Sequence, residues 1–175
     1  MTAKGSLPAV TLVLGGARSG KSWFAEQLIC SMPPPFFYVA TAEPRDLEMA
    51  ERIDSHKMRR GPDWQTLEVP LNLNETLKRL DKAGAVILVD CLTLWISNMM
   101  SKNKDIKTET AQLCSLSKKI DFPVIFVSNE VGLAVVPNNA MARHFVDYTG
   151  IMNQSIANVS NSVVFTIAGL TQKLK

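Results

Sequence analysis

The stretch "VTLVLGGARSGKS", residues 10–22, places an apolar run directly before a glycine-rich loop. Its last eight residues, 15–22, match the pattern G-x-x-x-x-G-K-[ST] at every fixed position. Glycines let backbone N–H groups wrap around a phosphate, and the start of a following helix adds a partial positive charge. The stretch therefore predicts a phosphate-binding loop between a buried strand and a helix. A chance match in a Gly- and Ser-rich loop is the alternative.

The residues of this loop are candidate nucleotide contacts with separate roles. Lys21 is the candidate catalytic cation, since it can reach the β- and γ-phosphates, and the Ser22 hydroxyl can bind Mg²⁺. Asp90 ends the apolar run 85–90 and is the candidate second ligand for Mg²⁺. An acid at that place could also cap the helix that follows. The full set of predicted loop contacts is Gly15, Gly16, Ala17, Arg18, Ser19, Gly20, Lys21 and Ser22.

Apolar runs alternate with helical patterns along the rest of the chain. The runs are continuous, as expected for parallel strands that are covered on both faces. This alternation predicts one P-loop NTPase-like (RecA-like) α/β domain over residues 1–175, with a mostly parallel sheet flanked by helices. The polar stretch 101–110 is expected to be a flexible loop. The predicted strands are 10–15, 36–40, 85–90, 124–130 and 163–169, and the predicted helices are 21–32, 46–60, 92–100 and 139–159.

Composition narrows the function classes. The chain has 175 residues, 46% of them apolar and 20% charged, with a net charge of +3. This mild charge does not suggest a nucleic-acid binder, though it suits anionic small molecules. The sequence has no run of eighteen apolar residues, so no membrane span is predicted. The N-terminus does not have the pattern of a signal peptide. Three cysteines without a CxxC pair favour a reducing cytoplasm.

The segment "IDSHKMRRGPDW", residues 53–64, holds one of only two histidines, His56, beside Lys57, Arg59 and Arg60. An ordinary surface histidine is one interpretation. The other is nucleophilic catalysis, in which a neutral imidazole attacks the α-phosphorus of a nucleoside triphosphate and holds the nucleotide as a phosphoramidate. Nearby cations would stabilise charge on the transferred group and disfavour the imidazolium form.

Several motifs together resemble one enzyme family. They are "GGARSGKS", "YVAT", "DCLTLWISN", "SNEVGLAVVPNNAMARHFVDYTGIMNQ" and "AGLTQKLK", which span residues 11–175 almost end to end. In this combination the chain resembles the bifunctional adenosylcobinamide kinase / adenosylcobinamide-phosphate guanylyltransferase of cobalamin biosynthesis. The resemblance implies two reactions: phosphorylation of adenosylcobinamide by ATP or GTP, and transfer of GMP from GTP to the new phosphate through a guanylylated histidine.

The resemblance also implies roles for particular residues. His56 matches the histidine that carries GMP, and Asp90 matches the acid at the end of its strand. Glu68 matches an acid tied to guanine nucleotide binding. Further residues match nucleotide-contacting segments: Ala40, Thr41, Ala42, Lys57, Met58, Arg59 and Arg60.

Beyond single residues, the resemblance implies a cytoplasmic homotrimer that uses Mg²⁺ with GTP and ATP, and that binds the corrinoid where subunits meet. The chain departs from the family in the segment 101–121, which looks shortened. Asn129 and Glu130 end a predicted strand, where a site role is open, and His144 is assigned no chemistry. Two rival functions remain: a small-molecule kinase without a histidine adduct, and a nucleotide-switched binding module.

Overall fold

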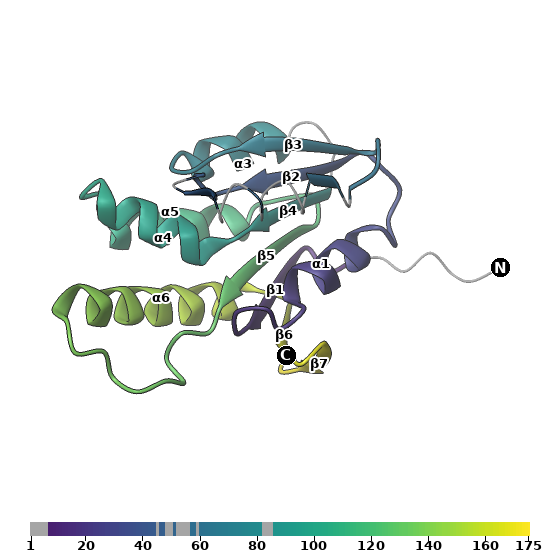
Figure 1. The fold of residues 1–175 in the computed structure, drawn as a ribbon. Coiled ribbons are helices and arrows are strands. Elements are labelled where there is room, and N and C mark those ends of the chain that lie inside the picture. The colour runs from purple at the N-terminus through teal and green to yellow at the C-terminus, as the bar shows by residue number, and fades with distance from the viewer. Residues whose placement is uncertain (1–6, 45, 48–50, 52–56, 59, 82–85) are drawn as a thin grey trace.

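The computed structural model describes residues 7–44, 46–47, 51, 57–58, 60–81 and 86–175. Its centre is a seven-stranded sheet in the order β3-β2-β4-β5-β1-β6-β7, with β3 at the top and β7 at the bottom of Figure 1. Every neighbouring pair is parallel except β6 and β7. The prediction of a mostly parallel sheet is confirmed. The strands are β1 (Val10–Gly15), β2 (Phe36–Ala40), β3 (Trp64–Glu68), β4 (Val86–Asp90), β5 (Val124–Asn129), β6 (Ser162–Ile167) and β7 (Leu170–Lys173).

Helices connect the strands, and polar side chains cap the N-termini of two of these helices. The Asp105 carboxylate accepts from the backbone N–H of Thr108, and the Asn139 side chain accepts from that of Ala142. None of the helices within the described ranges is long and apolar enough to cross a membrane. The helices are α1 (Lys21–Ile29), α3 (Leu73–Asp81), α4 (Leu92–Ser101), α5 (Ile106–Ser117) and α6 (Ala140–Val159).

The sheet is covered on both faces, which explains its continuous apolar strands. Along β1, Leu12 packs into a core with α3, α4, α5 and α6, whereas the next residue, Val13, packs into a second core with α1. The same alternation occurs in β4, where Ile87 faces the first core and Leu88 the second. Successive side chains of a strand point to opposite faces, so both must be apolar here.

The prediction of a flexible loop at 101–110 is wrong for most of this stretch, because only residues 102–105 connect the two helices. Helix α4 runs to Ser101, and α5 begins at Ile106 after the Asp105 cap. The buried side chains of α5 are Ile106, Thr110, Leu113 and Ser117, which follow helical spacing. Two of these four buried side chains are polar. The sequence of this stretch therefore looks like that of an exposed segment, although part of it is a packed helix.

Some predicted boundaries also change. The predicted strand 163–169 ends at Ile167, because Ala168 and Gly169 have φ of 50° and 78° and turn the chain into β7. The predicted strand 124–130 ends at Asn129, and the predicted helix 21–32 at Ile29. The predicted helix 46–60 lies largely outside the described residues.

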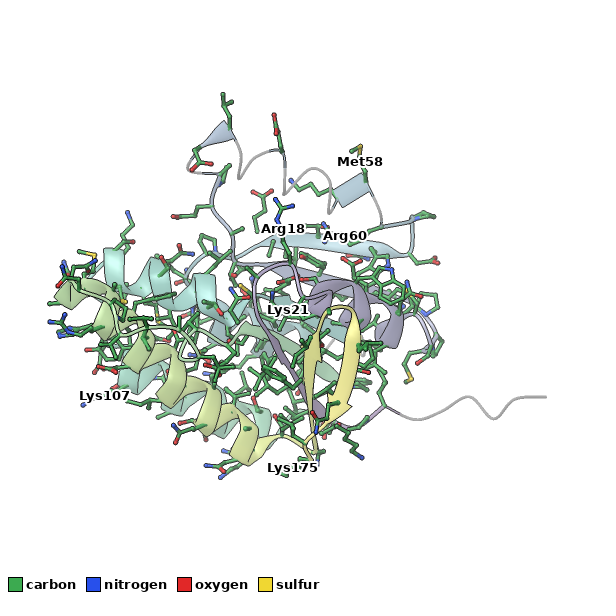
Figure 2. All side chains as sticks on the ribbon, turned by 60° about the horizontal axis from the view of Figure 1, so that its bottom comes forward. Arg18, Lys21, Met58, Arg60, Lys107 and Lys175 are labelled. Atoms are coloured by element: carbon green, nitrogen blue, oxygen red, sulfur yellow. The ribbon has the colours of Figure 1, made fainter. Side chains whose placement is uncertain are left out.

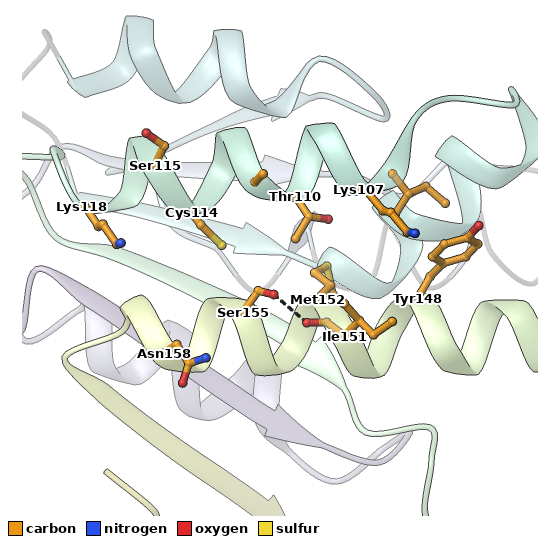
Figure 3. Close-up of a pocket in the computed structure, with 12 residues that line it drawn as sticks. Lys107, Thr110, Cys114, Ser115, Lys118, Tyr148, Ile151, Met152, Ser155 and Asn158 are labelled. Atoms are coloured by element: carbon orange, nitrogen blue, oxygen red, sulfur yellow. Dashed lines mark hydrogen bonds between the residues drawn. The ribbon is translucent and has the colours of Figure 1, made fainter.

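A groove of about 480 Å³ separates α5 from α6 on the side that faces away from the sheet (Figure 3). Cys114 and Thr110 line it from α5, and Tyr148 and Met152 from α6. Burial raises the pKa of the Cys114 thiol.

Candidate functional site

The carboxyl ends of the parallel strands bring most of the predicted site residues to one edge of the sheet. Strand register places Ala40 beside both Glu68 on β3 and Asp90 on β4. On the other side of β5, Gly15 lies beside Asn129 and Thr166. Ligands of open parallel sheets bind at this edge. Residues that are far apart in the sequence therefore share one possible binding surface.

The phosphate loop begins where β1 ends and is packed tightly there. A Cβ at Gly15 would lie 2.5 Å from both the Thr166 carbonyl oxygen and Ser19 Oγ, so only glycine fits. Gly20, with φ of 96°, lies next to Gly169 in the β6–β7 turn. The Gly169 N–H donates to the Ser19 carbonyl at 2.8 Å. The loop is thus held in shape by the turn before β7.

Lys21 is the first residue of α1 and only 9% exposed. Its Nζ donates to the Gly16 carbonyl oxygen at 3.1 Å, across the mouth of the loop. Ser22 follows it on the first turn of the nine-residue helix. The Lys21 cation and the N-terminus of α1 therefore lie at the loop, with Ser22 on the same first turn, an arrangement suited to binding a phosphate.

Asp90 ends β4 and is separated from the phosphate loop by β5. Its Oδ2 accepts a hydrogen bond from the Tyr38 hydroxyl at 3.0 Å. Burial raises the pKa of Tyr38 well above its ordinary value; the Asp90 carboxylate adds to this, and Arg60 opposes it. The cap of α4 is Cys91, whose Sγ accepts from the Leu94 N–H, and not Asp90. The capping alternative for Asp90 is therefore wrong.

The Ala40–Ala42 segment joins β2 to the end of β4. The Thr41 hydroxyl donates to the Cys91 carbonyl at 2.7 Å and accepts from the Cys91 N–H at 2.8 Å. Ala40 accepts from the Val69 N–H through its carbonyl at 2.7 Å. Ala42 is half-buried just beyond Thr41. The Thr41 side chain is used within the protein, so any contact of this segment with a nucleotide would come from its backbone or from Ala42.

The cationic segment lies beside β3. Lys57 Nζ pairs with Glu68 Oε1 at 2.8 Å, and both side chains are substantially exposed, at 41% and 64%. The Arg60 guanidinium lies over the Tyr38 ring, 3.5 Å from its centroid. Met58 is 81% exposed. The predicted nucleophile His56 and the predicted contact Arg59 lie outside the described residues.

The end of β5 adds polar groups between β1 and β4. The Asn129 N–H donates to Thr93 Oγ1 at 2.6 Å, and the Glu130 N–H donates to the Gly15 carbonyl at 3.1 Å. Asn129 Oδ1 is buried and has no hydrogen-bond partner within the described structure. Asn129 and Glu130 therefore lie at the site. His144, by contrast, is exposed on α6 and packs edge-on against Tyr148, with ring centroids 6.4 Å apart.

Figure 2 shows Arg18, Met58 and Arg60 in the upper part of the molecule and Lys21 near its centre, whereas Lys107 and Lys175 lie in the lower part. Strand register and the Lys57–Glu68 pair place Lys57 and the carboxylate of Asp90 at the edge of the sheet that also holds Lys21. This arrangement can bind a triphosphate and stabilise charge during phosphoryl transfer. Sequence reasoning gave no role to Tyr38, although the motif "YVAT" contains it.

Solved structures with the same fold support the architecture. The chain is similar to the flagellar accessory protein FlaH of Methanocaldococcus jannaschii, with a TM-score of 0.54 and 17% identity, covering 98% of this chain and 80% of that one. It is also similar to a prototypical ATPase from the type III secretion system of pathogenic bacteria, with a TM-score of 0.59 and 8% identity, covering 95% and 57%. At these identities the likeness concerns the fold, which is that of RecA-like P-loop ATPases, as predicted.

Sequence comparisons are more specific. The family model described as cobinamide kinase / cobinamide phosphate guanyltransferase matches residues 11–174. The bifunctional adenosylcobalamin biosynthesis protein CobP of Pseudomonas aeruginosa is 43% identical over 166 residues, covering 94% of this chain and 96% of that protein. CobU of Escherichia coli, which bears the same description, is 35% identical over 179 residues, covering 94% and 98%. The chain thus belongs to the cobinamide kinase / cobinamide phosphate guanyltransferase family.

Proposed function

We propose that this protein phosphorylates adenosylcobinamide with a nucleoside triphosphate and then transfers GMP from GTP to the product, giving adenosylcobinamide-GDP. The observation that carries the proposal is the complete phosphate loop at 15–22, folded between β1 and α1, in a chain of this family. Asp90 lies at the same sheet edge as Lys57, which pairs with Glu68, and Arg60 lies over the Tyr38 ring that donates to Asp90. Their chemistry suits transfer of a phosphoryl group and of a nucleotidyl group.

In the kinase step the protein mainly positions the two substrates and stabilises the charge on the phosphate oxygens. The hydroxyl of the aminopropanol arm attacks the γ-phosphorus, and the nucleoside diphosphate leaves. Loop N–H groups and Lys21 bind the phosphate oxygens, because Lys21 is already held at the mouth of the loop. Such transfer needs little covalent help from the protein, so correct placement of the two substrates supplies most of the rate.

In the guanylyl step His56 is the proposed nucleophile. An imidazole nitrogen attacks the α-phosphorus of GTP, a P–N bond forms, and pyrophosphate leaves. A phosphate oxygen of adenosylcobinamide phosphate then attacks the same phosphorus and releases the histidine. Lys57 and Arg60 are proposed to stabilise the phosphate charge, together with Arg59 and Met58 as further contacts of the segment. Glu68 is proposed to accept hydrogen bonds from the guanine base.

The donors at the sheet edge fit Mg²⁺. This ion prefers oxygen ligands and is commonly held by one or two protein groups together with substrate phosphates. Ser22 and Asp90 supply a hydroxyl and a carboxylate, and Asp90 uses one oxygen to accept from Tyr38, which leaves the other for a ligand. Ser22 and Asp90 would hold the ion, which supplies neutralisation of the charge on the phosphate oxygens.

We also propose a cytoplasmic homotrimer with the corrinoid bound where subunits meet. The loop after β5 supports a subunit contact, because it exposes several large apolar side chains close together in the chain. Leu133 is 82%, Val135 92% and Val136 75% exposed, and Met141 follows at 76%. Sedimentation at micromolar concentration would test this proposal. A mass three times that of the 19.3 kDa chain is expected, and a monomer would contradict it.

Covalent labelling with GTP that is radiolabelled at the α-phosphate tests the central proposal. Wild type with Mg²⁺ should retain a label that is labile in acid and stable in alkali, as a phosphoramidate is. His56→Ala should lose it. His144→Ala is the matched control, because His144 is the only other histidine and is exposed on α6, and it should keep the label.

The labelling experiment, together with an assay of corrinoid turnover, separates the rival functions. An unlabelled wild type that still binds GTP would leave a small-molecule kinase without a histidine adduct. Absence of turnover with any corrinoid acceptor would leave a nucleotide-switched binding module.

A further inference from the structure

Tyr38 occupies the middle of the site, between its acid and one of its cations. Register places it opposite Leu88 on β4, two residues before Asp90 and on the same face of the sheet. Its hydroxyl reaches diagonally to Asp90 Oδ2 at 3.0 Å. The face of its ring lies against the Arg60 guanidinium, at 3.5 Å. One side chain thus contacts both charged groups.

The position of the ring is fixed by its neighbours. Tyr38 is 5% exposed and packs in the core beneath α1. Trp64 of β3 packs edge-on against it, with ring centroids 6.3 Å apart. Phe36 packs on Trp64 in turn, at 5.2 Å. A rigid aromatic group in a strand can therefore set the positions of the longer, more flexible side chains that contact it.

Arg60 has donors that the described part of the protein leaves unused. Its Nε and Nη1 are buried and have no hydrogen-bond partner among the described residues. Burying cationic donors without partners is costly. The ring face of Tyr38 compensates part of this cost, and an oxygen-rich anion that reached these donors would compensate more of it. Hydrogen-bond donors without partners in the ligand-free protein are expected in an arginine that binds a phosphate.

A purely structural role would not need the hydroxyl. Phenylalanine would fill the same core space, and Phe36 already does so two residues earlier on the same face. The hydroxyl instead meets the carboxylate that is proposed to hold Mg²⁺.

We propose that Tyr38 is a positioning residue for phosphoryl transfer: its hydroxyl orients Asp90, and its ring holds Arg60 where the nucleotide phosphates bind. This inference rests on the proposed function. It separates two contributions of one side chain. Loss of the hydroxyl should affect what depends on Asp90, and loss of the ring should affect what depends on Arg60.

Two substitutions separate these contributions. Tyr38→Phe keeps the ring and should raise the Mg²⁺ concentration for half-maximal nucleotide binding about tenfold, the factor expected for one hydrogen bond to a charged group. Nucleotide affinity at saturating Mg²⁺ should stay within about twofold. Tyr38→Leu removes the ring as well and should weaken nucleotide binding at saturating Mg²⁺ by a further factor of about five.

Calorimetry with ADP, in Mg²⁺ titrations and in EDTA, is the measurement, and corrinoid phosphorylation is assayed in parallel. The matched control is Tyr148→Phe, which removes the only other tyrosine hydroxyl, located in the groove between α5 and α6 (Figure 3). This variant should bind and react as wild type does. In an Asp90→Ala background, Tyr38→Phe should have no further effect, because the acceptor of its hydroxyl is gone.

The inference is overturned if Tyr38→Phe shows the same Mg²⁺ dependence as wild type, or if its effect persists in Asp90→Ala. Tyr38→Phe preserves the core volume, so it tests the hydroxyl even if Tyr38→Leu fails to fold. Failure of the proposed function would look different: wild type would not phosphorylate a corrinoid, while Mg²⁺-dependent ADP binding would still report on Tyr38.

Discussion

The phosphate loop and the Lys57–Glu68 pair lie at the same edge of the sheet, but they are built in opposite ways. In the loop, Lys21 is 9% and Ser19 8% exposed, and backbone contacts from the β6–β7 turn hold the chain. At β3, the paired side chains of Lys57 and Glu68 are 41% and 64% exposed. One region is packed before any ligand arrives, whereas the other consists of exposed charges.

This difference teaches how one edge can serve two reactions. An exposed ion pair contributes little to stability. Each of its side chains can therefore leave the other and bind a ligand at small cost in free energy. A packed loop cannot rearrange cheaply, because its backbone fills the available space. The loop is therefore suited to grip the phosphates common to every nucleotide. The β3 side is suited to contacts that are made only with a particular base or with the transferred group.

The sharpest test of this contrast compares two lysines. Lys21→Ala should lower kcat/KM for both reactions by about 10²–10³, because it removes a cation from a packed, water-poor site. Lys57→Ala should lower only guanylyl transfer, by about tenfold, because its charge is exposed. Rates of corrinoid phosphorylation and of histidine labelling give both numbers. Equal losses in the two variants would contradict the contrast.

Two adjacent glycines test the packing of the loop. Gly15→Ala should lower the free energy of unfolding by about 1–3 kcal/mol, because a Cβ would lie 2.5 Å from the Thr166 carbonyl oxygen. Gly16→Ala should change it by less than about 0.5 kcal/mol, since a Cβ there meets nothing within 4 Å. Urea denaturation of the two variants measures the difference. A similar cost at both positions would mean that the loop adjusts freely.

Cys91, which follows β4 and caps α4, should make stability depend on pH. Burial raises the pKa of Cys91 to about 12. The unfolded thiol, with a pKa of about 8.5, releases its proton first, so stability is full below about pH 8.5 and falls as pH rises toward 12. The slope contributed is up to about 1.4 kcal/mol per pH unit.

Urea denaturation of wild type and Cys91→Ala, at several pH values between about 8 and 10, isolates this contribution. The difference in unfolding free energy between the two proteins should shrink as the pH rises. A difference that is constant over this range would show that the thiol titrates normally in the folded protein.

The exposed Lys57–Glu68 pair should contribute little to stability. Glu68→Gln should change the free energy of unfolding by less than about 1 kcal/mol. It should nevertheless raise KM for GTP in guanylyl transfer relative to the KM of ATP in the kinase reaction, because a carboxylate that recognises guanine is lost. Thermal unfolding and steady-state kinetics test the two halves. A large loss of stability would show that the pair is structural.

The sequence predicted the parts of this molecule whose signal is local. The phosphate loop follows from its pattern, and the alternation of apolar runs gives a mostly parallel sheet. Strand β3 was missed because it is an edge strand with mostly exposed side chains, so its apolar content is low. Helix α5 was missed because Thr110 and Ser117 occupy half of its buried face.

The site shows the same limit. Lys21 and Asp90 could be chosen from the loop motif and a strand end, and Glu68 came from the family resemblance. All three lie at one edge. The contact of Tyr38 with Asp90 depends on the register of β2 against β4, which no local pattern encodes. The role of Thr41 was predicted as nucleotide contact, whereas its hydroxyl bonds to Cys91. Such choices between neighbouring partners are made only when the strands pair.

The pairing of β1 has a consequence for synthesis of the protein. Val13 lies beside Val127 on one side and Val164 on the other, so the strand that leads into the loop is flanked by segments translated more than a hundred residues later. A ribosome that has made only the first half of the chain has produced the full loop motif without either neighbouring strand. Nucleotide binding by a nascent chain should therefore begin only after β6 emerges, and it would report completion of the domain.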